Sequence, residues 1–491
     1  MTKNQFSELK ISSDICRAIS LLGYEKPTQV QSEAIPFLLA KKDIIVKSQT
    51  GSGKTAAFGI PLCESIEWEE RAPQALVLTP TRELALQIQN DLFHIGRFKR
   101  LKVEAVFGRS PFAAQERQLK QRTHIVVATP GRLLDHLERG TVDLSKIETL
   151  VIDEADEMLD MGFIEQIEKV LDHVPSSATK ALFSATMPPA IKHLVEEYLV
   201  APQFIEVQVE NKVQDRIAQY FYRIKEEEKV QLLLDVVVVD NPTTCIVFCN
   251  TKLAVEEVAE SLTALGAKPE MLHGGMEQRD RTRIIKEYKQ GYFRYLVATD
   301  VAARGLDIAD VDMVINFDLP NSNENYTHRI GRTARFEKLG KAISFVNEFD
   351  DRRFDSISEN QEQQLTELKA PKEKLVMDKM SSFTAKQERA PKLKKTKELV
   401  FKDEIMKLHI NAGKKTKMRA GDVVGALCSI DGMTGEDIGV ISIADVSTFV
   451  EILNGKGEHV LKSLQHVPVK GRTRRVSKAN ESNYEKDIKN S

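Results

Sequence analysis

The pattern of apolar and polar positions divides most of the chain into short strands and longer helices. Short β-branched runs recur up to about residue 345, and longer stretches with helical spacing separate them. This alternation predicts parallel sheets covered by helices, with candidate chemistry at the carboxyl ends of the strands. We expect strands at residues 44–46, 75–78, 125–128, 149–152, 181–183, 245–248, 295–298 and 311–315.

The order of predicted elements changes after about residue 400. The apolar positions there predict a strand, a helix, two strands, a helix and a strand, at residues 405–410, 420–430, 438–443, 448–453, 460–465 and 467–476. This order, βαββαβ, is typical of the RNA-recognition-motif (RRM) fold. We therefore expect two α/β domains followed by a smaller α+β domain.

Polar segments mark the expected boundaries between these domains. The sequence loosens near residues 205–215, and it becomes rich in Gln, Glu, Lys and Ser after residue 350, where we expect a helix followed by a solvated tether. The resulting division is a first domain at 1–206, a second at 215–365, a polar linker at 366–402, an RRM-like domain at 403–478 and a tail at 479–491.

The charge of the chain is unevenly distributed. The 491 residues include 70 Lys and Arg against 72 Asp and Glu, and this net charge of −2 does not by itself favour a nucleic-acid partner. From Pro371 onward, however, 24 basic residues face 16 acidic ones, a net charge of +8 that leaves −10 for the rest. The last part of the chain is therefore the candidate electrostatic anchor.

Cysteine usage and hydropathy indicate a cytoplasmic protein. The five cysteines form no CxxC pair, which supports neither a disulfide framework nor a zinc site. Because no apolar stretch reaches membrane-spanning length, we expect no membrane partner.

A phosphate-binding motif follows the first predicted strand and opens a helix. Its glycines let backbone N–H groups converge on phosphate oxygens, Lys54 supplies a positive charge, and the Thr55 hydroxyl is a ligand for Mg²⁺. The motif consists of Ser48, Gln49, Thr50, Gly51, Ser52, Gly53, Lys54 and Thr55.

Two acidic residues complete a nucleotide-hydrolysis site. Asp153 and Glu154 come directly after the apolar strand at 149–152, so they can face the phosphate-binding loop across the sheet. Asp153 is expected to hold Mg²⁺ through water, and Glu154 to orient or deprotonate the attacking water. Lys54, Asp153 and Glu154 together predict hydrolysis of a nucleoside triphosphate.

The sequence Asp153-Glu154-Ala155-Asp156 resembles the motif that names the DEAD-box RNA helicases, and further motifs of that family follow in order over about residues 1–350. The resemblance implies two tandem RecA-like domains, ATP as the nucleotide, Mg²⁺ as the cofactor and RNA as the partner. Phe6 and Gln31 resemble the ends of the Q motif, in which the Gln amide matches the donor and acceptor edge of adenine.

The resemblance also implies RNA-binding and coupling residues in the first domain. The RNA-backbone motifs lie at strand ends, where hydroxyl groups and helix N-termini meet phosphates, and they supply Pro80, Thr81, Arg82, Gly108, Thr129, Pro130 and Arg132. Asp156, Ser184 and Thr186 are expected to link the ATP state to RNA binding. A simple helix cap is an equally acceptable reading of Ser184 and Thr186.

The second domain carries the later motifs of the same family. The expected roles are RNA binding for Thr251, Gln278, Arg281 and Thr299, ATP binding for Asp307, coupling for His328, and catalysis for Arg332 and Arg335. The two arginines are expected to act as arginine fingers, which are typically worth about 10³–10⁵ in rate. Without the phosphate-binding loop, a solvated basic helix would be the preferred explanation.

One position departs from the family pattern. Gly108-Arg109 stands where the family commonly has paired glycines. A side chain there either crowds the RNA backbone or adds a phosphate contact, and the sequence does not decide between the two.

Residues 404–478 resemble the RNA-binding domain of the DbpA-type helicases, a bacterial subgroup. That resemblance implies a hairpin of large-subunit ribosomal RNA and pre-ribosomal particles as partners. Phe449 is the one aromatic side chain expected to stack on a base, so basic residues should contribute more than usual. These are Lys414, Lys415, Lys417, Arg419, Lys470 and Arg472, which would otherwise only solubilise the surface.

The function expected from these motifs is an ATP-dependent RNA helicase that works as a monomer and remodels RNA locally. An ATP-gated RNA clamp or assembly scaffold without productive unwinding would carry the same motifs. A DNA translocase is disfavoured by the Asp-Glu-Ala-Asp motif and by the RRM-like end.

Overall fold

The computed structural model describes residues 5–48, 51–207, 216–300, 311–334, 339–361, 363–389, 391, 393, 401 and 404–479. Four residues with expected roles, Gln49, Thr50, Asp307 and Arg335, lie outside the described residues. The chain forms two compact units, one of Met1–Val207 with Lys395–Ser491 and one of Gln208–Lys394. No described helix combines the length and apolar character needed to cross a membrane.

The first domain is built on a seven-stranded sheet in which all pairs are parallel. Its strands are β1 (Ile44–Lys47), β2 (Ala75–Leu78), β3 (Val103–Val106), β4 (Ile125–Ala128), β5 (Thr149–Ile152), β6 (Thr179–Ser184) and β7 (Gln203–Glu206). The spatial order is β3-β4-β2-β5-β6-β1-β7. Parallel pairing brings the carboxyl ends of all these strands to one edge of the sheet.

Both faces of this sheet are buried, because alternate side chains of each strand meet helices on opposite sides. Ile44 and Val46 belong to one hydrophobic cluster, while Ile45 between them belongs to the other. The first cluster includes α1 (Ser13–Leu21), α2 (Gln29–Leu39), α3 (Lys54–Ser65) and α4 (Arg82–Ile95). The second includes α6 (Pro130–Glu138), α7 (Ala155–Asp160), α8 (Ile164–Leu171) and α9 (Pro189–Tyr198), with α5 (Phe112–Leu119) at its margin.

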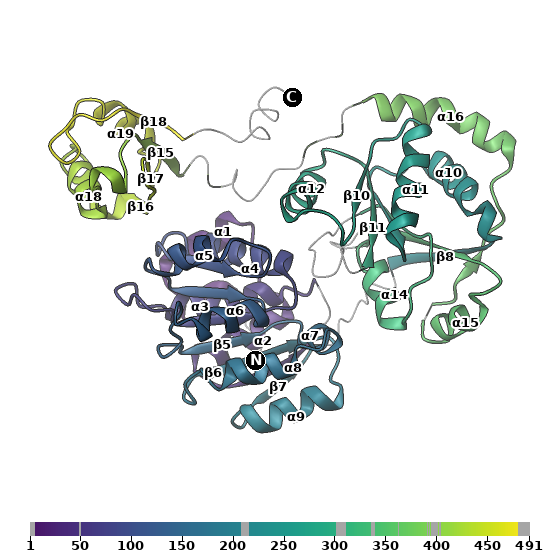
Figure 1. Ribbon diagram of the computed structural model, residues 1–491, viewed down its shortest axis with the longest axis horizontal. Helices are drawn as coiled ribbons and strands as arrows, with labels where there is room; N and C mark the ends of the chain where they lie inside the picture. Colours follow the sequence, from purple (N-terminus) through teal and green to yellow (C-terminus); the bar gives the residue numbers. More distant parts are fainter. Residues whose placement is uncertain are drawn as a thin grey trace. The chain divides into compact units, whose positions relative to one another are not determined.

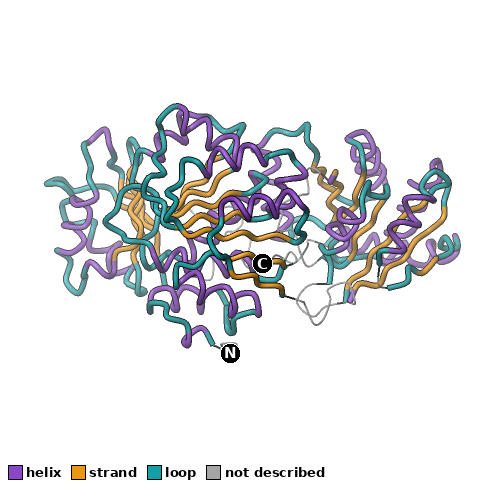
Figure 2. The backbone as a smooth tube through the Cα atoms, turned by 90° about the horizontal axis from the view of Figure 1, so that it is seen from below, coloured by secondary structure: helices purple, strands orange, loops and turns teal. Residues whose placement is uncertain are grey.

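The second unit repeats this plan around another seven-stranded sheet of parallel pairs, seen with the first in Figure 2. Its strands are β8 (Ile217–Arg223), β9 (Cys245–Cys249), β10 (Pro269–Leu272), β11 (Tyr295–Thr299), β12 (Met313–Asn316), β13 (Gly340–Val346) and β14 (Thr366–Glu367). They lie in the order β10-β11-β9-β12-β13-β8-β14.

Helices α10 (Lys229–Asp240), α11 (Lys252–Ala264) and α16 (Glu373–Glu388) pack on one face of this second sheet (Figure 1). The opposite face buries side chains of α12 (Gln278–Gln290), α14 (Asn323–Ile330) and α15 (Asp351–Glu359). The fully buried ring of Phe383 belongs to α16. Part of the segment expected to be a polar linker at 366–402 is therefore a helix packed on the second domain, because Val376, Met380 and Phe383 recur at helical spacing and pack against its core.

The C-terminal domain has a four-stranded antiparallel sheet in the order β16-β17-β15-β18. Its elements are β15 (Met406–Ile410), α18 (Ala420–Cys428), β16 (Ile438–Ile443), β17 (Thr448–Ile452), α19 (Gly457–Ser463) and β18 (Val476–Lys478). The predicted fold class is thus confirmed for all three domains. The predicted strand at 467–476 was misplaced, because Val467 and Val469 pack in the core outside the sheet, with only an isolated bridge from Val469 to Arg472, while Val476 pairs with Ile410.

Within the first unit, Phe401 joins the C-terminal domain to the first domain. Its buried ring stacks on His94, with centroids 5.3 Å apart and planes 6° apart, and clusters with Phe98 and Leu453. Next to it, Arg97 Nη2 lies 3.0 Å from Glu451 Oε1, and both side chains are almost fully buried. Such a pair is costly to break, because its loss leaves a buried charge without a partner.

Replacing Phe401 with alanine should loosen this contact. Phe→Ala changes in cores typically cost about 3–5 kcal/mol, since they remove buried area and leave a cavity. We expect amide hydrogen exchange in α1 and β17 to accelerate in Phe401→Ala. Phe349→Ala is the matched control, because Phe349 is 83% exposed in the second unit. Unchanged exchange in Phe401→Ala would show that the ring does not stabilise the contact.

Candidate functional site

The strand order of the first sheet sorts the expected site residues into two groups. The ends of β5, β6 and β1, which are neighbours, carry Asp153, Ser184 and Ser48. The ends of β3, β4 and β2 carry Gly108, Thr129 and the segment from Pro80 to Arg82. One edge of one sheet therefore holds the expected nucleotide motifs on one half and the expected RNA motifs on the other.

The phosphate-binding loop has the backbone geometry that its glycines allow. Gly51 and Gly53 have φ angles of 84° and 91°, in the left-handed region that glycine occupies without strain. Lys54 begins α3 and is largely buried, and its Nζ donates to the Ser48 carbonyl oxygen at 3.3 Å. A positive charge and a helix N-terminus thus converge at the end of β1, an arrangement that favours an anionic ligand.

Gln31 braces this loop. Its Nε2 donates to the Gly53 carbonyl oxygen at 3.2 Å, and its Oε1 accepts from the Thr28 backbone N–H at 3.0 Å. A Cβ at Gly53 would lie only 2.5 Å from Gln31 Nε2, so a larger residue would displace this amide and, at a φ of 91°, would also be strained. The structure places Phe6 in the adjacent hydrophobic cluster, buried among apolar side chains. Adenine recognition by Phe6 and Gln31 stays a prediction.

The acidic pair lies one strand away from β1. Burial raises the pKa of Asp153 to about 7, while the nearby Lys54 acts in the opposite direction. Glu154 has a φ of 55°, a strained conformation for a non-glycine residue, and its Oε2 is buried with no hydrogen-bond partner among the described residues. Unsatisfied buried oxygens are costly, so this carboxylate oxygen is poised to accept a hydrogen bond from a bound water.

Asp156 connects this acidic motif to the end of β6. Its Oδ2 accepts hydrogen bonds from the backbone N–H groups of Ala185 and Thr186, at 3.1 and 2.8 Å, and from the Thr186 hydroxyl at 3.1 Å. The Ser184 carbonyl oxygen in turn accepts from the Ser48 N–H at 3.0 Å. The three coupling residues expected in the first domain therefore lie in one hydrogen-bonded path that ends at the phosphate-binding loop.

The residues expected to bind RNA lie around the starts of two helices. Thr81 caps α4, accepting a hydrogen bond from Leu84 N at 3.3 Å, and Thr129 precedes α6 with Pro130 in its first turn. Arg132 Nη1 donates to the Ser110 carbonyl oxygen at 2.9 Å. Arg132 thus braces the loop after β3, and a direct RNA contact by this residue stays a prediction.

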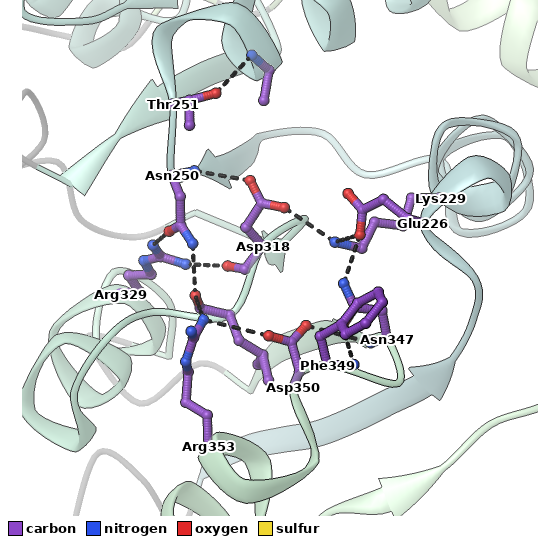
Figure 3. Close-up of polar contacts among 12 residues, drawn as sticks. Glu226, Lys229, Asn250, Thr251, Asp318, Arg329, Asn347, Phe349, Asp350 and Arg353 are labelled. Atoms are coloured by element: carbon purple, nitrogen blue, oxygen red, sulfur yellow. Dashed lines mark hydrogen bonds and ion pairs between the residues drawn. The ribbon is translucent and has the colours of Figure 1, made fainter.

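In the second unit, a buried arginine joins three strand ends, and Figure 3 shows its contacts with Asn250 and Asp318. Arg329 is 2% exposed, and it contacts both carboxylate oxygens of Asp300, after β11, at 2.5 and 2.6 Å. It also donates to Asn250 Oδ1, after β9, at 3.0 Å and to the Asp318 carbonyl oxygen, after β12, at 2.6 Å. Arg329 therefore fixes α14 against the sheet edge that carries the expected motifs.

The sequence reasoning gave Arg329 no role. A usable signal was its position on α14 beside Ile330 and three residues after Tyr326, both of which are fully buried. This spacing places the guanidinium on the inward face of the helix. A charge there requires partners, and the Asp300 carboxylate after β11 and the Asp318 backbone carbonyl after β12 provide them.

The expected site residues of the second unit lie at the ends of its elements. Thr251 caps α11 by accepting a hydrogen bond from Ala254 N at 3.1 Å, and Thr299 ends β11. Gln278 and Arg281 lie in the first turn of α12, while His328 lies on α14 and Arg332 directly after it. The structure leaves the RNA-binding, coupling and catalytic roles of these residues as predictions.

The basic residues of the C-terminal domain come together from two loops. Lys470 contacts the Lys417 carbonyl oxygen through its Nζ, and it pairs with Asp422 at 3.1 Å. A Cβ at Gly413 would lie 2.3 Å from the Ala444 carbonyl oxygen, so the loop that bears the first lysines packs tightly against 444–447. The residues on these loops are Lys414, Lys415, Lys417, Arg419, Lys470 and Arg472.

An aromatic pair lies on the sheet of the same domain. Phe449 on β17 faces His409 on β15, with ring centroids 5.1 Å apart, and the Lys407 ammonium lies 5.6 Å from the Phe449 ring. A pocket lined by these three residues, Ser477 and Lys478 opens beside them. Aromatic rings next to cations on an RRM-like sheet suit a stacked base with its phosphate.

Comparisons with known families agree with this arrangement. The DEAD/DEAH box helicase family matches residues 28–194, the helicase conserved C-terminal domain matches residues 228–337, and the DbpA RNA binding domain matches residues 407–478. These matches cover the two parallel-sheet domains and the C-terminal domain in turn.

Similar proteins support the same assignment, one over almost the whole chain and others over about three quarters of it. The chain is 50% identical over 477 residues to the ATP-dependent RNA helicase DbpA of Bacillus subtilis, covering 97% of this chain and 100% of that protein. It is 43% identical to the DEAD-box ATP-dependent RNA helicase CshA of Geobacillus kaustophilus, over 74% of this chain and 78% of that one. Among solved structures, S. cerevisiae Dbp5 bound to RNA and ADP BeF3 aligns with a TM-score of 0.69 and 30% identity, over 78% of this chain and 100% of Dbp5.

Together with the phosphate-binding loop, the acidic motif and the RRM-like domain, these matches confirm the resemblance found in the sequence. The chain belongs to the DEAD-box ATP-dependent RNA helicases, in the group that carries a DbpA RNA-binding domain.

Proposed function

We propose that this ATP-dependent RNA helicase remodels a hairpin region of large-subunit ribosomal RNA during ribosome assembly, as a cytoplasmic monomer acting on pre-ribosomal particles. The proposed ATP hydrolysis is supported by the conformation of Glu154. Its backbone is strained, and its buried Oε2 has no hydrogen-bond partner among the described residues. The observation that supports RNA targeting is the pairing of Phe449 with His409 beside two basic loops.

Mg²⁺ fits the donors at the nucleotide site. Among the described residues, no group of three or more His, Cys, Asp or Glu side chains is arranged to hold a metal. Mg²⁺ usually binds through one or two protein oxygens, substrate phosphates and water, so the Thr55 hydroxyl and the Asp153 carboxylate are a sufficient donor set. When bound, the ion would neutralise charge on the phosphates.

The proposed hydrolysis assigns a separate task to each residue. Lys54 and the N–H groups of the loop bind the phosphates, and Glu154 accepts a hydrogen bond from the attacking water and orients it. Arg332 and Arg335 act as arginine fingers on the charge that develops at the terminal phosphate. Asp156, Ser184 and Thr186 carry the nucleotide state from this site toward the RNA motifs.

An ATP-gated clamp is the second candidate function. It would use the same residues to bind and hold RNA without separating strands. A strand-displacement assay on a short RNA duplex separates the two, with ATP in one arm and a non-hydrolysable analogue in the other. Displacement that yields free strands supports the helicase, whereas RNA release without displacement supports the clamp.

Glu154→Gln tests the catalytic assignment. The amide keeps the shape of the side chain but cannot act as a base, so ATPase turnover should fall about 10²-fold or more while ATP and RNA still bind. Glu165→Gln is the matched control, because Glu165 is an exposed residue of α8 and its variant should retain full turnover. Near-normal hydrolysis by Glu154→Gln would contradict the assignment.

Phe449→Ala tests RNA targeting without removing the domain, whose deletion would uncover the Phe98 cluster. A stacked base is worth about 1–3 kcal/mol, so affinity for a ribosomal RNA hairpin should fall about 5- to 150-fold. Affinity for an unrelated RNA should change much less. Equal losses for both RNAs, or none for either, would refute a selective role, and Phe349→Ala again provides the control.

A further inference from the structure

Arg109 occupies a backbone conformation that does not favour an arginine. Its φ of 58° lies in the left-handed region, which costs a residue with a Cβ about 1 kcal/mol or more. Arg109 follows Gly108 in the loop after β3, at the same sheet edge as the other RNA motifs. Glycine would fit this conformation without strain, so the arginine side chain is present at a cost to stability.

Neighbouring residues hold this loop in place. A Cβ at Gly108 would lie 3.9 Å from Arg82 Nη2, so the guanidinium of Arg82 reaches the start of the loop. On the other side of Arg109, the Ser110 carbonyl oxygen accepts the hydrogen bond from Arg132 Nη1. The Arg132 guanidinium also donates to Gln115 Oε1 at 3.0 Å, and Gln115 Nε2 donates to the Phe107 carbonyl oxygen at 3.0 Å.

These contacts fix the backbone on both sides of Arg109 but do not engage its side chain. Arg109 is exposed, and within the described part of the chain its guanidinium forms no hydrogen bond or ion pair. The Arg132 guanidinium is engaged by Ser110 and Gln115. The Arg109 side chain is exposed to solvent, and Arg82 lies near the preceding residue, Gly108. The strand ends around Arg109 are expected to follow an RNA backbone. An exposed guanidinium there can donate charge-assisted hydrogen bonds to a phosphate oxygen.

We propose that Arg109 is an additional RNA-phosphate contact of the first domain, and that its charge compensates for the strained backbone. This inference rests on the RNA-binding role proposed for the strand-end motifs, and it resolves the two readings of Gly108-Arg109 in favour of a phosphate contact. The expected ligand is the sugar-phosphate backbone of single-stranded RNA, recognised without regard to base sequence.

Salt dependence of RNA binding measures this contact directly. Each phosphate neutralised on a single strand adds about 0.7 to the slope of log affinity against log salt. We would measure binding of the full-length protein to a single-stranded oligouridine by fluorescence anisotropy, with a non-hydrolysable ATP analogue, between about 50 and 200 mM salt. The slope for Arg109→Gly should be smaller by about 0.7, so its affinity should fall about threefold less over this range than that of the parent.

Two further variants separate charge from backbone. Arg109→Lys retains the charge and should keep the parent slope. Lys41→Gly is the matched control, because Lys41 is an exposed cation with a φ of 54° that precedes β1, at the opposite edge of the sheet. It undergoes the same change from strained cation to glycine and should leave the slope unchanged.

Arg82→Ala distinguishes failure of this inference from failure of the broader assignment. A reduced slope in Arg82→Ala with the parent slope in Arg109→Gly would overturn the role of Arg109 alone. Parent slopes in both variants would overturn the RNA-binding role of these strand ends as well. A reduced slope in Lys41→Gly equal to that in Arg109→Gly would also overturn the proposal, because the effect would then be one of net charge.

Discussion

Parallel pairing of the strands is the constraint on which both core domains depend. Because the strands of each large sheet run in the same direction, segments far apart in the chain end at one edge. Strand order then decides which of these segments are neighbours. In the first sheet, β6 lies between β5 and β1, so the backbone around Ser184 is bonded to Asp156 on one side and to Ser48 on the other. The hydrogen-bonded connection between these motifs thus follows directly from topology.

Most residues of the nucleotide site could be predicted from the sequence, because they directly follow apolar strands. Each strand is recognisable from its apolar run, and the motif residues after it are recognisable from their side-chain chemistry. Among the missed strands, β3 and β10 lie at sheet edges and carry a polar residue within a short apolar run, which weakens the pattern. The interior strands β8 and β13 were missed as well, so edge position is not the whole reason. The packing of α16 was missed although Val376, Met380 and Phe383 recur at helical spacing, because the Gln, Glu, Lys and Ser residues around them favoured a solvated segment. Arg329 was missed because its partners come from three strands whose adjacency only the fold establishes.

Arginine has two distinct uses in this protein, and burial separates them. Arg329 and Arg132 donate to carbonyl or carboxylate oxygens of their own domain, so they hold loops in place. Arg109 is exposed and held by its backbone alone. A motif arginine therefore cannot be given a ligand from its position in the sequence. Glu154 and Arg109 share a left-handed backbone, but the control residue Lys41 has it as well, so this conformation alone does not assign a task.

The contact between Glu451 and Arg97 limits how the C-terminal domain can read a nucleic acid. Phe449 and Glu451 are two residues apart on β17, so their side chains project from the same face of the sheet. Arg97 of the first domain covers Glu451. Part of the sheet face on which an RRM-like domain usually binds nucleotides is therefore buried against protein. An unpaired base on this face would therefore find exposed surface around Phe449 but not over Glu451.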